Sequence, residues 1–508
     1  MPLLLQSACM FQKVLIANRG EIAARIVRAL REMEISSVAV FSDADRGALH
    51  VRLADEAEHI GASASAQSYL NVERIIEAAQ KHGAQAIHPG YGFLSENAKF
   101  AEACEAAGLV FIGPSADTIQ RLGSKTAART LAKQVFVPVV PGSEEPATNI
   151  EHARKLARQL GYPVLLKAAA GGGGKGMRRV NAESELEAAI RDAASEAERA
   201  FKNSEVYIEK VIEQPRHIEI QIAGDRFGNL VHLGERECSI QRRHQKIIEE
   251  CPSPLVSRKP EMRHEMGEAA LRVARAANYY NLGTVEFLTD QDGNFYFLEV
   301  NTRLQVEHPV TELVTGLDLV HLQMHIAAGE ALPFAQGDVR WNGWAMECRI
   351  CAEDPDHQFF PSPGKIAQLR EPAGPGIRLD SGVYPGWNIP LEYDPLLAKL
   401  VAWAPGRDWV VRRLDRALSE YAIAGVPTNV PFFREILQDS EFRRGALHTG
   451  YLADLMARRS RQQASPELDL AVALAAVAAT PRNGDSAIKG ERADSSKWLI
   501  EGRSHSLR

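Results

Sequence analysis

Short apolar strands alternate with amphipathic helices through roughly the first 120 residues. The apolar runs typical of buried strands are 13–17, 37–42, 86–88 and 109–112. The helical patterns cover about 21–33, 71–82 and 96–107. Parallel strands need such helical crossovers, so the alternation predicts a doubly wound α/β sheet. The first turn, Ala17-Asn-Arg-Gly20, lacks the glycine pattern of a dinucleotide site. We therefore expect this region to form one wall of a site.

The 508 residues are enough for two to four domains, and 24% charged residues with 45% hydrophobic ones are typical of an ordered enzyme. A break near Gly142–Pro146 marks the start of a predicted small lobe over about 140–211. Residues 343–455 are rich in strands and then helical, which predicts a third domain with core strands near 345–351 and 397–402. Beyond, 456–508 are expected to form an Ala-rich helix, over about 465–479, and a flexible tail.

Residues 283–301 form two predicted strands joined at Asp292-Gly293, a dipeptide typical of two-residue hairpin turns. With that turn, Glu286 lies opposite Glu299, and Asn301 lies on the same face. Facing carboxylates repel each other, but a Mg²⁺ ion bound between them would turn this repulsion into a net attraction. The hairpin therefore predicts a magnesium site. A solvent-facing hairpin is the alternative, and a bulge would shift the register and break the pairing.

The polar alternation continues beyond the hairpin. Its members are Glu299, Asn301, Arg303, Gln305 and Glu307. Period two would place them on one face of an extended segment, which Pro309 ends and after which Thr311 could cap a short helix. An arginine beside a carboxylate there can bind a small oxyanion. An edge strand with a solvated face would show the same pattern.

Two further segments indicate phosphate chemistry. The run Gly171–Gly176 follows an apolar strand and Lys167, so its N–H groups could close over phosphate oxygens at a mobile lobe tip. Ser239–Lys246 gathers fixed cations and one histidine that could stabilise a transferring phosphoryl group. A plain flexible loop and a solvated basic loop are the respective alternatives. Glu209–Ile212 by itself predicts only a structural strand.

Charge and cysteine usage narrow the function classes. A formal net charge of −6 disfavours nucleic-acid or anionic-membrane partners. The first residues have no basic region and too short an apolar block for a signal peptide, and Met10 is the predicted functional start. Six cysteines in a chain of this length do not suggest a disulfide framework, so a reducing cytoplasm is expected. Cys348 and Cys351 form one CxxC pair, which alone is weak evidence for metal or redox chemistry.

Taken together, these segments resemble the biotin carboxylase component of acyl-CoA carboxylases, an ATP-grasp enzyme. The likeness covers about 10–455 without large gaps. The matching segments are Val14–Ile22, His88–Asn97, Lys167–Met177, Glu237–Lys246, Asn301–Pro309, Glu347–Ile350 and Phe360–Lys365. The resemblance implies a Rossmann-like domain over 10–120, an ATP-grasp domain over 125–330 whose mobile lid is the lobe at about 140–211, and a C-terminal α+β domain over 343–455.

Site roles carry over residue by residue from this resemblance. It implies that Glu307 is the general base for bicarbonate, that Arg349 stabilises the biotin enolate and helps to place the anion, and that Tyr91 lines the biotin approach. Bicarbonate would be held by Lys246, Arg303, Gln305 and Val306. ATP would be bound by Lys125, Lys167, Gly173, Gly174, Glu209, Lys210, Ile212, His217, Gln241 and His244. Mg²⁺ or Mn²⁺ would be held by Glu286, Glu299 and Asn301.

The implied reaction activates bicarbonate with ATP through carboxyphosphate and carboxylates biotin. The chain has no Met-Lys dipeptide, so biotin is expected on a separate biotin carboxyl carrier protein. Carboxyltransferase subunits and a homodimer are also implied. The final acceptor stays open among acetyl-CoA, propionyl-CoA, methylcrotonyl-CoA and pyruvate. Another ATP-grasp ligase or a non-catalytic nucleotide-binding scaffold are the competing hypotheses.

Overall fold

The computed structural model describes residues 10–143, 146–147, 149–168, 177–201, 204–243 and 245–463. One compact unit ends at Leu452, and the described part of a second, short unit is the end of helix α16 (Tyr451–Gln463). The predictions for residues 1–9 and for the Ala-rich helix at 465–479 lie outside the described residues. Along the described chain no helix is long and apolar enough to cross a membrane.

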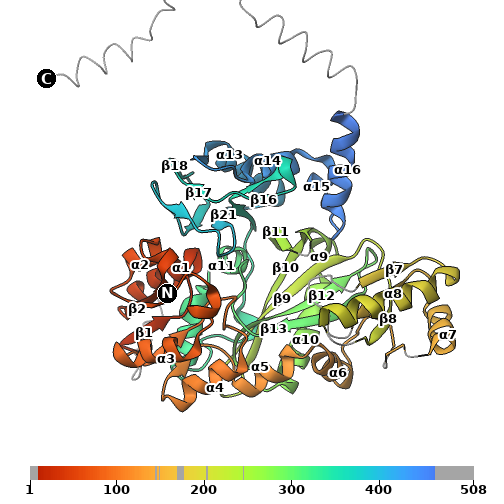
Figure 1. The fold of residues 1–508 in the computed structure, drawn as a ribbon, viewed down its shortest axis with the longest axis horizontal. Coiled ribbons are helices and arrows are strands. Elements are labelled where there is room, and N and C mark those ends of the chain that lie inside the picture. The colour runs from red at the N-terminus through yellow and green to blue at the C-terminus, as the bar shows by residue number, and fades with distance from the viewer. Residues whose placement is uncertain are drawn as a thin grey trace, which may run out of the picture. The chain divides into compact units, whose positions relative to one another are not determined.

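The N-terminal region, which is red to orange in Figure 1, forms the predicted parallel sheet. Its strand order is β3-β2-β1-β4-β5. Its strands are β1 (Lys13–Ile16), β2 (Ser36–Ser42), β3 (Glu56–Gly61), β4 (Ala86–His88) and β5 (Val110–Phe111). Its helices are α1 (Gly20–Glu32), α2 (Leu49–Leu53), α3 (Val72–Lys81), α4 (Ala98–Ala106) and α5 (Ala116–Gly123). The sequence pattern did not indicate β3, because Glu56, Glu58 and His59 interrupt its apolar residues. An edge strand tolerates these polar side chains.

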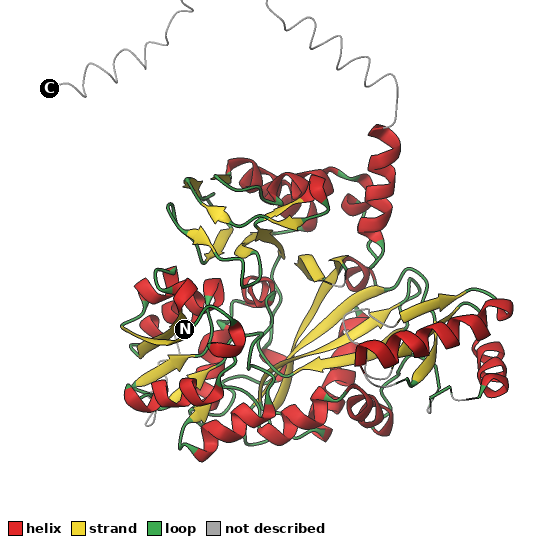
Figure 2. Ribbon diagram, viewed as in Figure 1, coloured by secondary structure: helices red, strands yellow, loops and turns green. Residues whose placement is uncertain are grey.

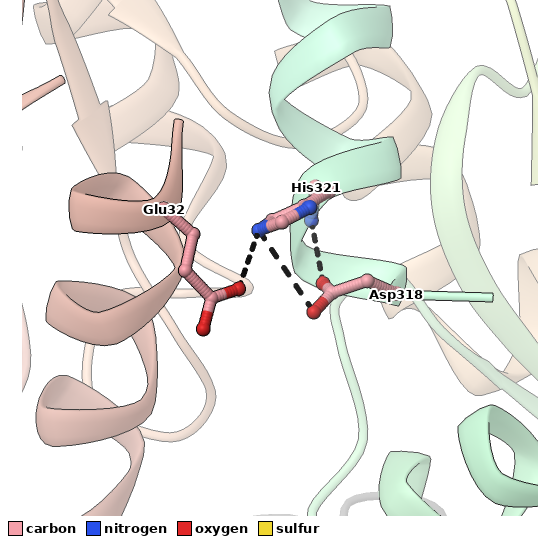
Figure 3. Close-up of side chains that lie close together, drawn as sticks. All are labelled: Glu32, Asp318 and His321. Carbon is pink, nitrogen blue, oxygen red and sulfur yellow. Dashed lines mark hydrogen bonds and ion pairs between the residues drawn. The ribbon is translucent and has the colours of Figure 1, made fainter. Parts of the chain in front are cut away.

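Helix α1 joins this sheet to helix α12 (Leu319–Ala327). Apolar side chains of the two helices belong to one buried cluster. Arg25 of α1 donates to Asp318 Oδ2, the N-cap of α12, at 2.6 Å. At the outer end of the contact, His321 Nε2 lies 3.5 Å from Glu32 Oε2 and 3.9 Å from Asp318 Oδ2 (Figure 3). Ion pairs and apolar burial therefore fix α1 against the domain that carries the hairpin.

A second, eight-stranded antiparallel sheet holds the hairpin, in the order β13-β12-β9-β10-β11-β14-β21-β19. Its strands are β9 (Arg216–Gly224), β10 (Leu230–Arg242), β11 (Gln245–Cys251), β12 (Asn281–Thr289), β13 (Phe295–Asn301), β14 (Trp344–Cys351), β19 (Ile377–Ser381) and β21 (Leu396–Ala404). The strands predicted near 345–351 and 397–402 exist as β14 and β21, but they continue this sheet through the β11–β14 ladder. The C-terminal region therefore shares its main sheet with the hairpin region.

The predicted lobe has a sheet and a core of its own. Strands β6 (Val164–Ala168), β7 (Met177–Val180) and β8 (Val206–Lys210) pair in the order β7-β6-β8. Helices α7 (Ile150–Leu160) and α8 (Glu183–Phe201) pack on this sheet (Figure 2). A separate apolar cluster that includes Leu166 and Ile208 lies between sheet and helices. The predicted glycine tip Gly171–Gly176, with Gly173 and Gly174, lies outside the described residues.

The remaining elements pack around the eight-stranded sheet. The helices are α6 (Lys125–Gln134), α9 (Pro254–Arg258), α10 (Glu261–Ala276), α11 (His308–Thr315), α13 (Arg407–Glu420), α14 (Val430–Gln438) and α15 (Ser440–Arg443). The short strands are β15 (Glu353–Asp354), β16 (Phe360–Pro361), β17 (Gly364–Lys365), β18 (Gln368–Arg370), β20 (Asn388–Ile389) and β22 (Ala422–Ala424). Helix α10 contacts β9 and β10, and α13 contacts β14 and β21.

Candidate active site

The hairpin places Glu286 opposite Glu299 by a route different from the predicted one. The two-residue turn at Asp292-Gly293 was a wrong prediction, because Thr289 already pairs with Phe295. The Asp290 carboxylate accepts from the backbone N–H groups of Asp292 and Asn294, which stabilises a longer loop. A register shift between Glu286 and Phe287 then moves the pairing by one residue, which brings Glu286 opposite Glu299. The bulge expected to break the Glu286–Glu299 pairing is therefore what produces it.

Lys246 lies at the centre of a buried carboxylate cluster. Its ammonium Nζ is 2.5 Å from Glu219 Oε2, 2.8 Å from Glu286 Oε1 and 2.7 Å from Glu307 Oε1. Glu219 is fully buried and is held from the other side by Arg236 Nε at 2.5 Å. The Lys246 ammonium thus contacts both Glu286, a candidate metal ligand, and Glu307, the candidate general base.

The three predicted metal ligands are not equally placed. Asn301 Nδ2 donates to Glu286 Oε1 at 2.9 Å, and His217 Nε2 lies 2.9 Å from Glu286 Oε2. Glu299 instead pairs with Lys125 Nζ at 3.0 Å, and its side chain is 31% exposed. Carboxylate and amide oxygens on facing strands are a donor set that fits Mg²⁺. Lys246 and Lys125 pair with Glu286 and Glu299, so cationic side chains reduce the repulsion between these two carboxylates, a role that we expected a metal to fill.

The polar alternation after Asn301 does not continue as a strand. β13 ends at Asn301, and helix α11 begins at His308 with Glu307 at its N-cap position. The prediction that Pro309 ends the segment and Thr311 caps a helix was therefore wrong. Proline fits the first helical turn, where its missing N–H is not needed. Thr311, inside the helix, accepts from Arg236 Nη1 at 3.0 Å.

Arg303 nevertheless gathers the polar side chains of this segment. Its guanidinium donates to Asn301 Oδ1 and Gln305 Oε1, both at 3.1 Å, and to Glu96 Oε2 at 2.9 Å. The backbone carbonyl of Val306 accepts from Lys399 Nζ at 2.8 Å. The segment that would hold bicarbonate is therefore fixed by one arginine and one buried lysine.

Arg349 completes the surroundings of Glu307. It lies on β14, its Nη2 is 2.9 Å from Glu307 Oε2, and its Nε donates to Glu249 Oε1 at 2.6 Å. Burial alone would raise the pKa of Glu307, but the charges of Lys246 and Arg349 outweigh it and hold that pKa well below its usual range. Glu307 is therefore a fully buried carboxylate kept ionised between two cations.

A cavity of about 530 Å³ opens beside this cluster. Its wall includes Tyr91 from the N-terminal region, Lys246, Arg303 and Val306 from the hairpin region, and Arg349 from β14. The expected role of the N-terminal region as one wall of a site agrees with this arrangement. The cavity can take an organic group next to Arg349 and a small anion next to Lys246.

The predicted ATP residues do not all lie in one place. Lys167 of the lobe forms an ion pair with Glu209, which also binds Arg129. Gln241 lies 2.8 Å from His217 Nδ1, next to Glu286. Lys210 Nζ instead donates to the Gly161 carbonyl at 2.7 Å, because adjacent residues on a strand point to opposite faces. Ile212 is half-buried just after β8, and His244 lies outside the described residues.

Sequence reasoning missed several charged residues of this site, namely Glu219, Arg236, Glu249, Glu347 and Lys399. All are buried. A signal for Glu219 exists in the sequence, because His217, Glu219 and Gln221 alternate with isoleucines along one strand. Charged side chains in such a strand are rarely buried without a polar partner.

Three family models match the chain in order. They are described as biotin carboxylase N-terminal domain (residues 10–119), carbamoyl-phosphate synthase L chain ATP-binding domain (124–335) and biotin carboxylase C-terminal domain (347–454). Biotin carboxylase 1 of Bacillus subtilis is 52% identical over 444 residues, which cover 87% of this chain and 98% of that protein. The biotin carboxylase of Nostoc sp. is 52% identical over 445 residues, or 88% of this chain and 99% of that protein.

Solved structures agree with this similarity. The biotin carboxylase–β-γ-ATP complex from Campylobacter jejuni is 46% identical with a TM-score of 0.82, and the match covers 87% of this chain and 99% of that one. The biotin carboxylase domain dimer of Hydrogenobacter thermophilus 2-oxoglutarate carboxylase, bound to MgADP, ADP and bicarbonate, is 48% identical with a TM-score of 0.81, covering 88% and 98%. The chain belongs to the biotin carboxylase family, the enzymes that carboxylate biotin in an ATP-dependent reaction.

Proposed function

We propose that Glu307 is the general base that takes the proton of bicarbonate. The observation that carries this proposal is its position, buried and ionised between Lys246 and Arg349, which both line the cavity. A base works best when its pKa lies near the operating pH. A bound bicarbonate would compete for the two cations, which raises the pKa of Glu307 toward that range. Lys246, Arg303, Gln305 and Val306 are the proposed contacts of the anion, and Arg349 would help to place it.

ATP and Mg²⁺ fit the hairpin side of the cluster. We assign ATP to Lys125, Lys167, Glu209, Lys210, Ile212, His217 and Gln241, together with Gly173, Gly174 and His244 beyond the described residues. Glu286, Glu299 and Asn301 would hold Mg²⁺ or Mn²⁺, whose charge stabilises the transferring phosphoryl group. Lys125 and Lys246, which neutralise Glu299 and Glu286, are the cations that a metal would release toward phosphate or bicarbonate.

Biotin would enter the cavity beside Arg349. A guanidinium fixed on both sides can stabilise negative charge on the ureido oxygen without reorganising. Tyr91 would line the approach, and exclusion of water from the cavity would protect an intermediate such as carboxyphosphate. We expect the biotin to be attached to a separate carrier protein, and the carboxyl group to pass to a separate carboxyltransferase. Relatives named as components of pyruvate carboxylase and 2-oxoglutarate carboxylase leave the final acceptor open.

Assembly and location follow by analogy. The related biotin carboxylase domain of Hydrogenobacter thermophilus is a dimer, and we propose a homodimer for this chain as well. Five cysteines of the described residues are free, which supports a reducing cytoplasm.

Bicarbonate-dependent release of ADP in the presence of free biotin tests the proposed roles. Glu307→Gln should abolish carboxybiotin formation while it retains nucleotide binding. Glu420→Gln, a surface carboxylate on α13 paired with Arg416, is the matched control and should behave like wild type. Carboxybiotin formation by Glu307→Gln at the wild-type rate would exclude Glu307 as the base.

A further inference from the structure

Two buried carboxyl groups face each other behind Arg349. Glu249 of β11 and Glu347 of β14 are register partners, and both side chains are fully buried. Glu249 Oε1 accepts from Arg349 Nε at 2.6 Å. Glu249 Oε2 and both oxygens of Glu347 have no hydrogen-bond partner among the described residues. A buried, unpaired carboxylate is costly, so the charge state of this pair needs an explanation.

The surrounding charges do not balance two ionised carboxylates. The cations facing Glu347 are Arg349, two residues along β14, and Lys399, which is paired with Arg349 across β21. Arg349 already binds Glu307 as well as Glu249. Lys399 is shared by the Val306 carbonyl, Glu21 at 3.4 Å and Asp380 at 3.9 Å. Glu307 and Asp380 have further cations, Lys246 at 2.7 Å and Arg378 at 2.8 Å. Arg349 and Lys399 are therefore left to balance three carboxyl groups, namely Glu21, Glu249 and Glu347.

We propose that Glu249 and Glu347 hold one proton between them, so that the pair carries a single negative charge and Glu249 positions Arg349 against Glu307 without a second charge opposing the guanidinium. The inference rests on the roles proposed above for Arg349 and Glu307. Facing carboxyl groups repel each other strongly when both are ionised in a buried site, so one of the two takes up a proton. Glu249 and Glu347 are positioning residues, because neither is assigned a contact with substrate.

The direction of the acidities agrees with this arrangement. Burial raises the pKa of Glu249 to about 7, against the lowering effect of Arg349, and it raises the pKa of Glu347 well above its usual range. Two coupled acids titrate as a pair, so the pair holds one negative charge near neutral pH and gains a second only on the alkaline side. That second charge would offset the positive charge that Arg349 presents to an anion. We therefore expect the KM for bicarbonate to rise with alkaline pH.

The experiment measures KM for bicarbonate, KM for ATP and kcat against pH, with the bicarbonate concentration corrected at each pH for its equilibrium with CO₂ and carbonate. Glu347→Gln resembles the protonated acid, so the alkaline rise of KM for bicarbonate should disappear in this variant, whereas Glu347→Asp should keep the rise. Glu249→Ala removes the acceptor that holds Arg349 Nε in place and should raise KM for bicarbonate about tenfold, with KM for ATP unchanged.

Glu250→Gln is the matched control. Glu250 is buried on the same strand, next to Glu249, but accepts from Arg407 Nε and from the Trp344 indole at 2.8 and 2.7 Å. Its variant should lose thermal stability and keep the wild-type pH profile. A wild-type alkaline rise that persists unchanged in Glu347→Gln would overturn the proposal.

A second measurement does not depend on turnover. The infrared difference spectrum of wild type minus Glu347→Gln at neutral pH should contain the C=O stretch of a protonated carboxylic acid. Absence of that band would mean that the pair holds no proton and would refute the inference even if the enzyme is active. Wild-type protein with the band but without bicarbonate-dependent ADP release would instead contradict the proposed function.

Discussion

The ammonium of Lys246 lies 2.7 Å from Glu307 Oε1 while it also contacts Glu219 and Glu286. This one side chain connects the hairpin carboxylates with the residue that we assign as general base. Burial alone would lower the pKa of Lys246, but the three carboxylates raise it well above its usual value, so the lysine is charged throughout the working pH range.

Lys246→Gln should therefore affect both stability and activity. Three buried carboxylates would lose their shared cation, which costs about 3–5 kcal/mol when one partner of a buried pair is removed. We expect a lower thermal midpoint and loss of bicarbonate-dependent ADP release. Lys246→Arg, which keeps the charge, should recover most of the midpoint. A Gln variant as stable as wild type would show that the carboxylates are not ionised together.

Glu299→Gln gives a cleaner test of the metal site than Glu286→Gln. Glu299 is partly exposed and pairs with the exposed Lys125, whereas Glu286 is buried against Lys246 and His217. Glu299→Gln should raise the Mg²⁺ concentration needed for half-maximal ATP turnover, with the thermal midpoint of the metal-free protein unchanged. Magnesium titration of ADP release measures this. An unchanged magnesium requirement would remove Glu299 from the ligand set.

Arg349→Ser should separate biotin chemistry from nucleotide binding. The contacts of Arg349 are Glu249 and Glu307, and neither is among the proposed ATP residues. We expect carboxybiotin formation to fall by at least tenfold, since a charge-assisted hydrogen bond contributes about 1.5–3 kcal/mol. Isothermal titration with a non-hydrolysable ATP analogue should give nearly the wild-type affinity. A large loss of ATP affinity would contradict the assigned role.

Glu21 makes stability depend on pH. Burial raises the pKa of this carboxyl from 4.5 to about 7, although the charge of Lys399 acts in the opposite direction. The folded protein therefore binds more protons than the unfolded chain between those values, and stability falls as pH rises through this window by up to about 1.4 kcal/mol per pH unit. Glu21→Gln removes this loss, so its thermal midpoint should exceed that of wild type increasingly from about pH 5 to pH 7.

Thermal unfolding at several pH values measures this effect, with exposed Glu420→Gln as the control. If Glu21→Gln were equally destabilised at every pH, Glu21 would instead be an ionised partner of Lys399, which lies 3.4 Å away.

The lobe should unfold locally, because its core is separate from the main core. Leu166→Ala removes a fully buried side chain from that cluster and should cost about 2–5 kcal/mol. Hydrogen exchange should then rise in β6 and β8, with β9 and β12 unchanged. Ile220→Ala, in the central core, is the matched comparison and should increase exchange in β9 and β12. Uniform loss of protection in both variants would mean that the lobe is not an independent unit.

Local pattern determined much of this fold. Apolar runs separated by helical periods predicted β1, β2, β4, α1 and α3, because parallel strands buried on both faces need apolar side chains on both faces. The same reasoning found the lobe and the strands β14 and β21. It could not show that these two strands join the hairpin sheet, since the β11–β14 ladder links residues about a hundred positions apart.

The site shows the same division. Spacing alone put Glu286 opposite Glu299, although the loop length and the bulge were each different from the prediction and offset one another. The resemblance named Lys246, Glu307 and Arg349, and the structure brings them together. Only the tertiary structure decided which carboxylates share Lys246 and which carboxyl pair lies behind Arg349. The reason is physical: desolvation and partner geometry set the charge state of a buried group, and both depend on strands distant in sequence.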